Sequence, residues 1–302
     1  RTRSLVEGGG AAAEAASAAR FPVSGRAYSV GLTGAPGAGK STITDGLVRR
    51  LRAEGLEVGV LAVDPTSPFS GGALLGDRVR MQDHATDPGV FIRSMATRGH
   101  LGGLALATPQ AMRVLDAAGK PWILVETVGV GQVEVEVAAA TDTTVVVLNP
   151  GWGDAVQANK AGLMEIADVF VINKADRPGV DDTERDVRQM LELGGEREWQ
   201  PPVVRAVATD GEGLHAVWDA VCEHRVHQER SGGLAVRRRA RLGDEVRAIV
   251  GARLAARVDA RTREDAFDAL LDDVVARTID PYAAATRLMA DVPGGADGEP
   301  PP

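Results

Sequence analysis

The residues best suited to chemistry form a glycine-rich loop near the start of the chain. Residues 34–41 match the full phosphate-loop pattern, and they are Gly34, Ala35, Pro36, Gly37, Ala38, Gly39, Lys40 and Ser41. Glycines let successive backbone N–H groups surround phosphate oxygens without a Cβ in the way. Lys40 supplies a positive charge for the β and γ phosphates, and the Ser41 hydroxyl is a ligand for Mg²⁺. The loop therefore predicts binding of a nucleoside di- or triphosphate.

A second motif, Asn-Lys-Ala-Asp at residues 173–176, indicates which base is bound. The carboxylate of Asp176 can accept two hydrogen bonds from the N1–H and N2–H₂ edge of guanine, whereas adenine has no such pair of donors. Asn173 can brace the loop and contact the base, and the aliphatic part of Lys174 can lie over the ring. We therefore expect the ligands to be GTP and GDP.

Acidic residues close two of the predicted strands. Asp64 closes the second strand, and Glu126 closes the third, in a Glu-x-x-Gly sequence where many GTPases have Asp-x-x-Gly. A carboxylate beside the phosphate loop can hold Mg²⁺ directly or through water, and Gly129 can offer its N–H to the γ-phosphate. Each acid alone is also compatible with an ordinary turn or helix cap. Together with the phosphate loop, the two acids favour a magnesium site.

The elements that must position these residues alternate between apolar strands and amphipathic helices. Strands are predicted at residues 28–32, 58–63, 122–125, 144–148, 169–172 and 203–207. The first helix is predicted at 41–51, with Ile43, Leu47 and Leu51 on one face. This order predicts an α/β fold with a doubly wound, mostly parallel sheet covered on both faces. Ligands of such sheets bind at the carboxyl ends of the strands, where all of these motifs lie.

Composition limits the class of protein. A chain of 302 residues with 44% hydrophobic content can bury the core of one α/β domain and a smaller appendage. Its single cysteine, Cys222, excludes a disulfide framework or a thiolate metal site within one chain, and its net charge of −8 argues against a nucleic-acid partner. Without an apolar run that could span a bilayer or a secretory segment, we expect a cytoplasmic protein with no membrane partner. Because the chain begins with Arg1, we expect that its true N-terminus is missing.

Three longer strings are similar to the MeaB/ArgK family of GTPases, which accompany adenosylcobalamin-dependent methylmalonyl-CoA mutase. These strings cover residues 64–78, 93–103 and 126–132, and the similarity extends from about residue 30 to 223 with a looser match at 280–282. The resemblance implies a P-loop GTPase of the SIMIBI branch with N- and C-terminal helical extensions. It also implies a homodimeric chaperone that gates adenosylcobalamin loading and protects methylmalonyl-CoA mutase or a related mutase.

The resemblance implies roles for individual residues. The phosphate loop of the family extends to Thr42, and its magnesium-side acids fall on Asp64, Asp77 and Glu126. Its guanine-reading residues fall on Asn173, Lys174 and Asp176, with backbone contacts to the base from Val207, Ala208 and Thr209. A mobile loop corresponds to residues 150–160, in which Gln157 and Lys160 match positions linked to communication with the mutase.

The groups expected to contribute to hydrolysis are Lys40, Glu126 and Gln132. No glutamine directly follows the Glu-x-x-Gly motif, where Ras-like enzymes place theirs, and Gln132 comes three positions later. We therefore expect a slow intrinsic GTPase that a partner stimulates, with its rate resting on positioning and charge. Arg93 and Arg98 can either supply charge to the transition state or form surface ion pairs.

Helical extensions flank the predicted nucleotide-binding domain. We expect a helical or flexible extension at residues 1–26, the GTPase domain at 27–228, a helical arm at 229–292 and a disordered tail at 293–302. Apolar stripes in the arm are formed by Leu242, Val246, Ile249, Val250 and Leu254, and by Phe267, Leu270, Leu271, Val274 and Val275. These helices either pack on the domain or form the dimer arm that the resemblance implies. The basic run at 237–241 is interpreted as a solvated helix face.

Two other functions remain open. A metal-insertion GTPase for nickel would share the same branch of phosphate-loop proteins. Such proteins usually need Cys and His ligands, and this chain has one cysteine and five scattered histidines. A kinase that acts on a periplasmic transport protein has also been attached to the family by name, but the sequence indicates neither a protein-substrate groove nor a base to activate an acceptor.

Overall fold

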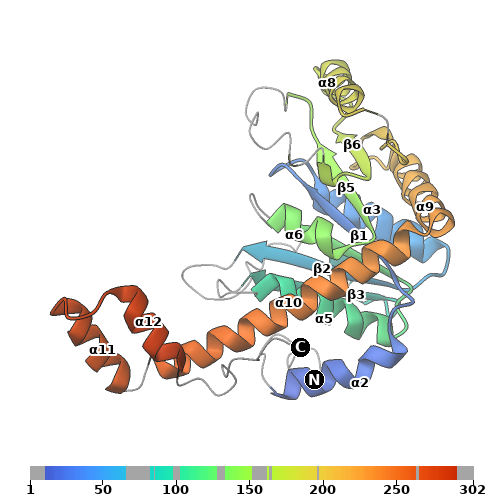
Figure 1. The fold of residues 1–302 in the computed structure, drawn as a ribbon. Helices are drawn as coiled ribbons and strands as arrows, with labels where there is room; N and C mark the ends of the chain where they lie inside the picture. The colour runs from blue at the N-terminus through green and yellow to red at the C-terminus, as the bar shows by residue number, and fades with distance from the viewer. Residues whose placement is uncertain are drawn as a thin grey trace. The chain divides into compact units, whose positions relative to one another are not determined.

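The structure is a computed structural model, and it describes most of the chain (Figure 1). The described residues are 11–65, 82–84, 86–97, 103–127, 133–151, 162, 165–195, 197–262 and 265–290. The chain divides into two compact units, Arg1–Val246 and Arg247–Pro302. The first unit holds the whole sheet, and the second holds the last helices.

The first unit is built on a seven-stranded sheet whose paired strands are all parallel. The strands are β1 Tyr28–Gly34, β2 Val58–Pro65, β3 Val90–Thr97, β4 Trp122–Thr127, β5 Thr143–Leu148, β6 Val169–Asn173 and β7 Val203–Ala206. Their order is β3-β2-β4-β1-β5-β6-β7, so β1 is central. Strands β2, β3 and β4 lie on one side of β1, and the chain crosses to the other side between β4 and β5. The predicted doubly wound parallel fold is confirmed. In such sheets the reversal of strand order places a ligand crevice at the carboxyl end of the central strand.

Helices cover both faces of this sheet (Figure 1). Those of the first unit are α2 Ala11–Arg20, η1 Phe21–Val23, α3 Lys40–Ala53, η2 Gln82–His84, α5 Gly103–Ala117, α6 Val133–Ala140, α8 Val180–Leu193 and α9 Leu214–Ser231. Helices α3 and α9 pack on the face that carries Val145 and Val147, whereas α8 packs on the face that carries Val146 and Leu148. Burial on both faces explains why the strand sequences are continuously apolar.

Helix α3 positions the glycine-rich loop. Ile43, Leu47 and Leu51, the predicted apolar stripe, are each 0% exposed and lie in the core under β1. Full burial of three large aliphatic side chains contributes about 1.5–3 kcal/mol each, before the entropic cost of ordering them. The first turn of the helix is therefore held firmly at the carboxyl end of β1.

Strand β3, Val90–Thr97, was not predicted. Arg93 and Ser94 interrupt its apolar character, and its position at the edge of the sheet leaves residues 91–94 only partly buried. The strand that ends with Glu126 is consequently the fourth in chain order, and the prediction that it is the third was wrong.

The boundary between the two units falls within α10, Gly233–Arg261, and the second unit continues with α11 Asp265–Val275 and α12 Pro281–Ala290. Val250 and Leu254 of the predicted stripe are 52% and 50% exposed, and Val275 is 80% exposed. The predicted tail at 293–302 lies outside the described residues. Within the described part of the chain, the helices are too short or too polar for any of them to cross a membrane.

Candidate nucleotide site

The glycine-rich loop connects the carboxyl end of β1 to the first turn of α3. Gly34, Gly37 and Gly39 have φ angles of 129°, 72° and 93°, in the region that favours glycine. A Cβ on Gly34 would lie 2.0 Å from the carbonyl oxygen of Val147, and one on Gly39 would lie 2.2 Å from Nδ2 of Asn173. Both the backbone conformation and the close approach of neighbouring atoms therefore require glycine at these two positions.

Positive charge is concentrated inside the loop. The Nζ atom of Lys40 donates hydrogen bonds to the carbonyl oxygens of Gly34, at 2.7 Å, and Ala35, at 3.1 Å. Lys40 is only 7% exposed, and it is the first residue of α3, where the helix dipole is positive. A buried ammonium at a helix N-terminus, next to glycines that leave room for an anion, is suited to phosphate.

Ser41 and Glu126 provide oxygen ligands beside the loop. Ser41 Oγ donates a hydrogen bond to Oε1 of Glu126 at 2.5 Å, and Glu126 is 1% exposed near the end of β4. A hydroxyl and a carboxylate in contact fit the ligand preference of Mg²⁺. Asp64 lies near the end of β2, which pairs directly with β4. Because the two strands are parallel, the backbone of Asp64 is at the same, carboxyl end of the strands as Glu126. Asp77 lies outside the described residues.

Asn173 connects the base motif to the phosphate loop. It is the last residue of β6 and is 3% exposed. Its Nδ2 atom donates to the carbonyl oxygen of Ala38 at 2.8 Å, and its Oδ1 atom accepts from the N–H of Ala208 at 3.1 Å. One amide side chain thus holds together the phosphate loop, the Asn-Lys-Ala-Asp motif and residues 207–209.

The next residues of the motif turn toward the same loop. Lys174 has a φ of 59°, and its Nζ atom donates to the carbonyl oxygen of Gly37 at 2.6 Å. The N–H of Ala175 donates to the carbonyl oxygen of Ala206 at 3.0 Å, which ties the motif to β7. Asp176 is exposed to solvent, and Val207 and Ala208 are buried while Thr209 is exposed. This arrangement leaves the carboxylate of Asp176 accessible to a ligand.

Several predicted residues cannot be placed at the site. Gln132, Gln157, Lys160 and Arg98 lie outside the described residues. Arg93 is described, and it lies within β3 at the edge of the sheet, separated from β1 by β2 and β4. Adjacent strands are about 4.8 Å apart, so the backbone of β3 is about 14 Å from that of β1.

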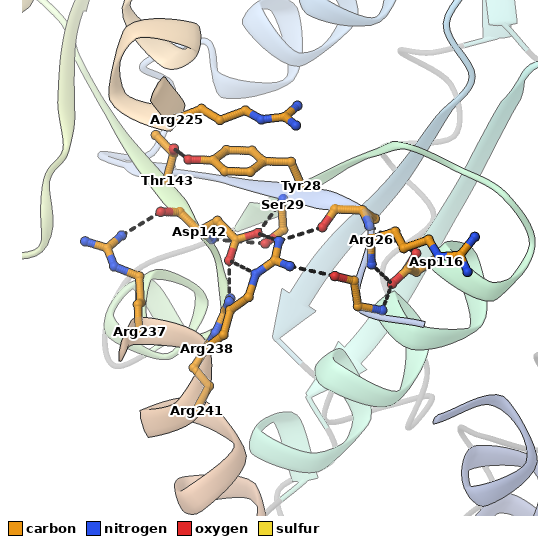
Figure 2. A network of polar contacts seen from close by, with 12 residues as sticks. Arg26, Tyr28, Ser29, Asp116, Asp142, Thr143, Arg225, Arg237, Arg238 and Arg241 are labelled. Atoms are coloured by element: carbon orange, nitrogen blue, oxygen red, sulfur yellow. Dashed lines mark hydrogen bonds and ion pairs between the residues drawn. The ribbon is translucent and has the colours of Figure 1, made fainter. Parts of the chain in front are cut away.

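The interpretation of the basic run at 237–241 as a solvated helix face was wrong for Arg237, Arg238 and Arg241, whereas Arg239 is exposed. Arg238 and Arg241 bind the carboxylate of Asp142, with Arg238 Nη2 at 2.8 Å from Oδ2 (Figure 2). Arg237 Nη1 lies 2.7 Å from Oδ2 of Asp168. These five residues are called the arginine clamp below. Burial alone would raise the pKa of Asp142, but the hydrogen bond from Arg238 and the charges of Arg241 and Arg238 hold it below its ordinary value.

A parallel sheet of this strand order, with a phosphate loop after its central strand and the guanine motif after β6, defines a P-loop GTPase. The sequence model of a family described as "Methylmalonyl Co-A mutase-associated GTPase MeaB" matches residues 1–263. The chain therefore belongs to the MeaB family, and the predicted resemblance is confirmed.

Individual relatives agree with this assignment. A Pyrococcus abyssi protein named as a GTPase is 54% identical over 279 residues, which cover 91% of this chain and 86% of that protein. The mouse protein named "Methylmalonic aciduria type A homolog, mitochondrial" is 41% identical over 216 residues, or 70% of this chain and 52% of that protein. A crystal structure described as that of a "LAO/AO transport system kinase" has 30% identity and a TM-score of 0.67, and covers 92% of this chain and 86% of that one. The predicted GTPase activity is supported by the description of the family, by the name of the Pyrococcus protein and by the fold.

Proposed function

We propose that this GTPase is a cytoplasmic chaperone of methylmalonyl-CoA mutase or of a related adenosylcobalamin-dependent mutase. In this proposal the nucleotide state gates loading of the cofactor into the mutase and protects the loaded enzyme. The observation that carries the proposal is the match to a family described as mutase-associated, over residues 1–263. The name of the mouse relative, which refers to methylmalonic aciduria, supports the same client.

In the proposed site, residues 34–42 bind the phosphates of GTP or GDP, with Lys40 as the charged contact. The exposed carboxylate of Asp176 accepts the two hydrogen bonds from the guanine edge, and the stem of Lys174 lies over the ring. Val207, Ala208 and Thr209 contribute backbone contacts to the base. The hydrogen bond from Asn173 to Ala38 supports this assignment because it fixes the distance between the phosphate and base subsites.

Mg²⁺ fits the same site, and the residues proposed to hold it are Ser41, Asp64, Asp77 and Glu126. The contact between Ser41 Oγ and the buried carboxylate of Glu126 supports the assignment, because both atoms are the hard oxygen ligands that this ion prefers. When bound, the ion neutralises negative charge that develops on the β and γ phosphates. The protein contributes by keeping Glu126 buried next to Ser41.

We propose that hydrolysis depends on Lys40, Glu126 and Gln132, and that the intrinsic rate is slow. Lys40 stabilises charge on the phosphoryl group, and the buried Glu126 positions Ser41. Gln132 would orient the attacking water, and Gln157 and Lys160 would pass the nucleotide state to the mutase. The assignments of Gln157 and Lys160 rest on the family resemblance, and that of Gln132 rests on its position three residues after Gly129.

A homodimer formed through the helical arm at 229–292 is also part of the proposal. Large apolar side chains stand exposed on the arm, among them Leu254 at 50%, Val275 at 80% and Tyr282 at 86%. These side chains lie on α10, α11 and α12, and exposed apolar surface of this kind is a common feature of subunit interfaces. The domain division predicted above, with the GTPase domain at 27–228, remains part of this proposal.

The test is a binding measurement between the full chain and purified methylmalonyl-CoA mutase without nucleotide, with GDP and with a non-hydrolysable GTP analogue. We expect a complex whose dissociation constant changes about 5- to 150-fold between nucleotide states, the usual range of allosteric coupling. An Asp176→Asn variant is the matched control, because it should respond to xanthine nucleotides and not to guanine nucleotides. Absence of binding in every state would contradict the proposal.

Two alternatives give different results in separate assays. The similar crystal structure carries the name of a transport system kinase, which favours protein phosphorylation as a second candidate. With γ-labelled GTP or ATP, a kinase would transfer label to protein, whereas the proposed chaperone releases inorganic phosphate. A nickel-insertion GTPase would bind Ni²⁺ tightly in a calorimetric titration, and we expect no such binding.

A further inference from the structure

Helix α6, Val133–Ala140, connects the two ends of the sheet beside β1. Five residues, 128–132, separate it from Thr127, the last residue of β4, at the end of the sheet that holds the phosphate loop. Its eight residues span about 12 Å. After the helix, the chain enters β5 at Thr143, at the amino end of the sheet where the arginine clamp lies. The same short helix therefore approaches both the nucleotide site and the clamp.

One side of α6 rests directly on β1. Val137 is 0% exposed, and a Cβ on Gly31 would lie 2.5 Å from Oγ1 of Thr141 and 3.0 Å from Cγ1 of Val137. Glycine at this position lets the helix approach the backbone of the strand that leads into the phosphate loop. Just after α6, the N–H of Asp142 donates to the carbonyl oxygen of Ser29 at 3.0 Å, and the N–H of Ser29 donates to Oδ2 of Asp142 at 3.0 Å. These bonds fix the carboxyl end of α6 on β1.

Another side of α6 faces a pocket of about 360 Å³. Glu136, Ala139 and Ala140 contribute to its wall from α6, and the remaining walls come from η1, α5, α10 and the amino-terminal ends of β1 and β4. Ala139 is exposed to solvent. Because protein interiors are close-packed, a helix moves as a unit most easily toward a side that is not packed against other side chains. For α6, the pocket is such a side.

Arg241 of α10 joins the last turn of α6 to the residue that is fixed on β1. Its Nη1 donates to the carbonyl oxygen of Ala140 at 2.6 Å, and its Nη2 binds the carboxylate of Asp142 (Figure 2). Carbonyls of the last helical turn lack partners within the helix and carry the negative end of its dipole, so a guanidinium stabilises them. A tilt of α6 about Asp142 would break the bond to Ala140 and keep the one to Asp142. The bond from Arg241 to Ala140 therefore opposes such a tilt.

From these observations we infer that α6 is a switch element that responds to the γ-phosphate, and that Arg241 is its latch. The contact between the γ-phosphate and the N–H of Gly129, expected from the Glu-x-x-Gly sequence, pulls on the segment that leads into α6. The helix tilts into the pocket, and the start of α10 loosens as the bond from Arg241 to Ala140 breaks. GDP has no γ-phosphate, so with GDP the helix stays latched. The inference rests on the proposed phosphate site and is independent of the client mutase.

The first test compares the affinities of the full chain for GDP and for a non-hydrolysable GTP analogue by fluorescence titration. Because the latch opposes the movement, Arg241→Gln should bind the GTP analogue about 5-fold more tightly, and GDP within twofold of the native value. Ala139→Met narrows the pocket, so it should bind the GTP analogue about 5-fold more weakly, again with GDP unaffected. The matched controls are Arg239→Gln in the same helix and Ala216→Met on α9, both at exposed positions, and they should behave as the native protein.

Hydrogen exchange followed by mass spectrometry measures the loosening of α10. In the native protein, the amides of residues 237–246 should exchange about 5-fold faster with the GTP analogue than with GDP, whereas those of α8 should not change. Arg241→Gln should exchange fast in both nucleotide states, so the dependence on nucleotide disappears. Arg239→Gln should keep it.

Two results would overturn the inference. One is that Arg241→Gln and Ala139→Met change the affinities for GDP and the GTP analogue by the same factor, or not at all, which would indicate a purely structural role. The other is native exchange at residues 237–246 that does not depend on the nucleotide. Ala139→Met and the native exchange decide the question if Arg241→Gln does not fold. A native protein that binds neither nucleotide would overturn the proposed phosphate site together with this inference.

Discussion

The two ends of the central strand β1 are held by different kinds of interaction. At the carboxyl end, side chains donate to main-chain carbonyls of the phosphate loop: Lys40 to Gly34 and Ala35, and Asn173 to Ala38. At the amino end, carboxylates receive the hydrogen bonds. Asp116 accepts from the N–H groups of residues 25–27, and Asp142 accepts from the N–H of residue 29 and from Arg238 and Arg241 (Figure 2).

Because of this difference, the carboxyl end of β1 serves ligand binding and the amino end serves stability. Donors at the carboxyl end hold the loop in shape around glycines, and the exposed carboxylate of Asp176 is accessible to a base. At the amino end, the buried charge of Asp142 is compensated by arginines of the same chain. We therefore expect substitution of the exposed Asp176 at the carboxyl end to change nucleotide affinity with little effect on folding, and substitutions in the arginine clamp to change folding with little effect on GDP affinity.

The largest expected effect is at the carboxyl end, for Asp176→Asn. Asparagine offers an N–H where guanine requires a second acceptor, so affinity for GDP should fall about 1,000-fold, as for loss of a buried charged hydrogen-bonding partner. Because Asp176 is exposed, the urea midpoint should not change. Fluorescence titration with a labelled GDP and urea unfolding followed by circular dichroism measure the two quantities.

Xanthosine diphosphate provides the control for this variant. Its base has a carbonyl where guanine has the amino group, so the asparagine N–H gains a partner and binding should recover. Loss of GDP affinity accompanied by a lower urea midpoint would show instead that Asp176 stabilises the fold. In that case the contrast between the two ends of β1 would be wrong.

The sequence predicted the strands of the inner sheet because those strands are buried on both faces, and continuous apolar runs identify them. It missed β3 because an edge strand can hold Arg93 and Ser94 in its interior. It also placed the ends of β1, β2 and β4 too early, because these strands contain Gly34, Pro65 and Glu126, which are not typical strand residues.

The two nucleotide-binding motifs could be predicted from the sequence because each consists of consecutive residues. The bond from Asn173 to Ala38 spans 135 residues, and no sequence spacing indicates that the two atoms meet. The same limit explains the misinterpreted basic run. Arg238 and Asp142 are 96 residues apart, so the run could not be distinguished from a solvated helix face until the fold brought the two together.

At the amino end, we expect Asp142→Asn to destabilise the protein by about 3 kcal/mol, because the variant leaves Arg238 and Arg241 without a compensating buried charge. GDP affinity should stay within twofold of the native value, because Asp142 lies at the opposite end of β1 from the phosphate loop. Urea unfolding and GDP titration again give both numbers. Asp210→Asn is the matched control, since this exposed aspartate should leave both numbers unchanged. A stable Asp142→Asn protein with impaired GDP binding would reverse the assigned roles of the two ends.

The smallest expected effect is a pH dependence of stability that arises from His224. This histidine is 0% exposed, its Nδ1 lies 2.8 Å from the hydroxyl of Thr143, and its Nε2 lies 3.3 Å from Oδ1 of Asp168. Its pKa is lowered from 6.5 to about 4, chiefly by burial. Asp168 and Asp142 oppose this shift, and Arg237 and His227 contribute to it. Neutral His224 therefore favours the folded state, and protonation favours the unfolded state.

Because the pKa is depressed in the folded state, the stabilisation is fully present above the unfolded pKa of about 6.5 and is lost as the pH falls toward 4. At pH 5 the loss should be about 2 kcal/mol relative to pH 8. His224→Gln should flatten this part of the profile, whereas His215→Gln, at an exposed histidine, should not. The lowered pKa of Asp142 acts in a separate window, because its contribution is lost only as the pH falls below about 4. Urea unfolding from pH 8 to pH 4 would measure the slope, and an equal slope in His224→Gln and the native protein would show that another group carries it.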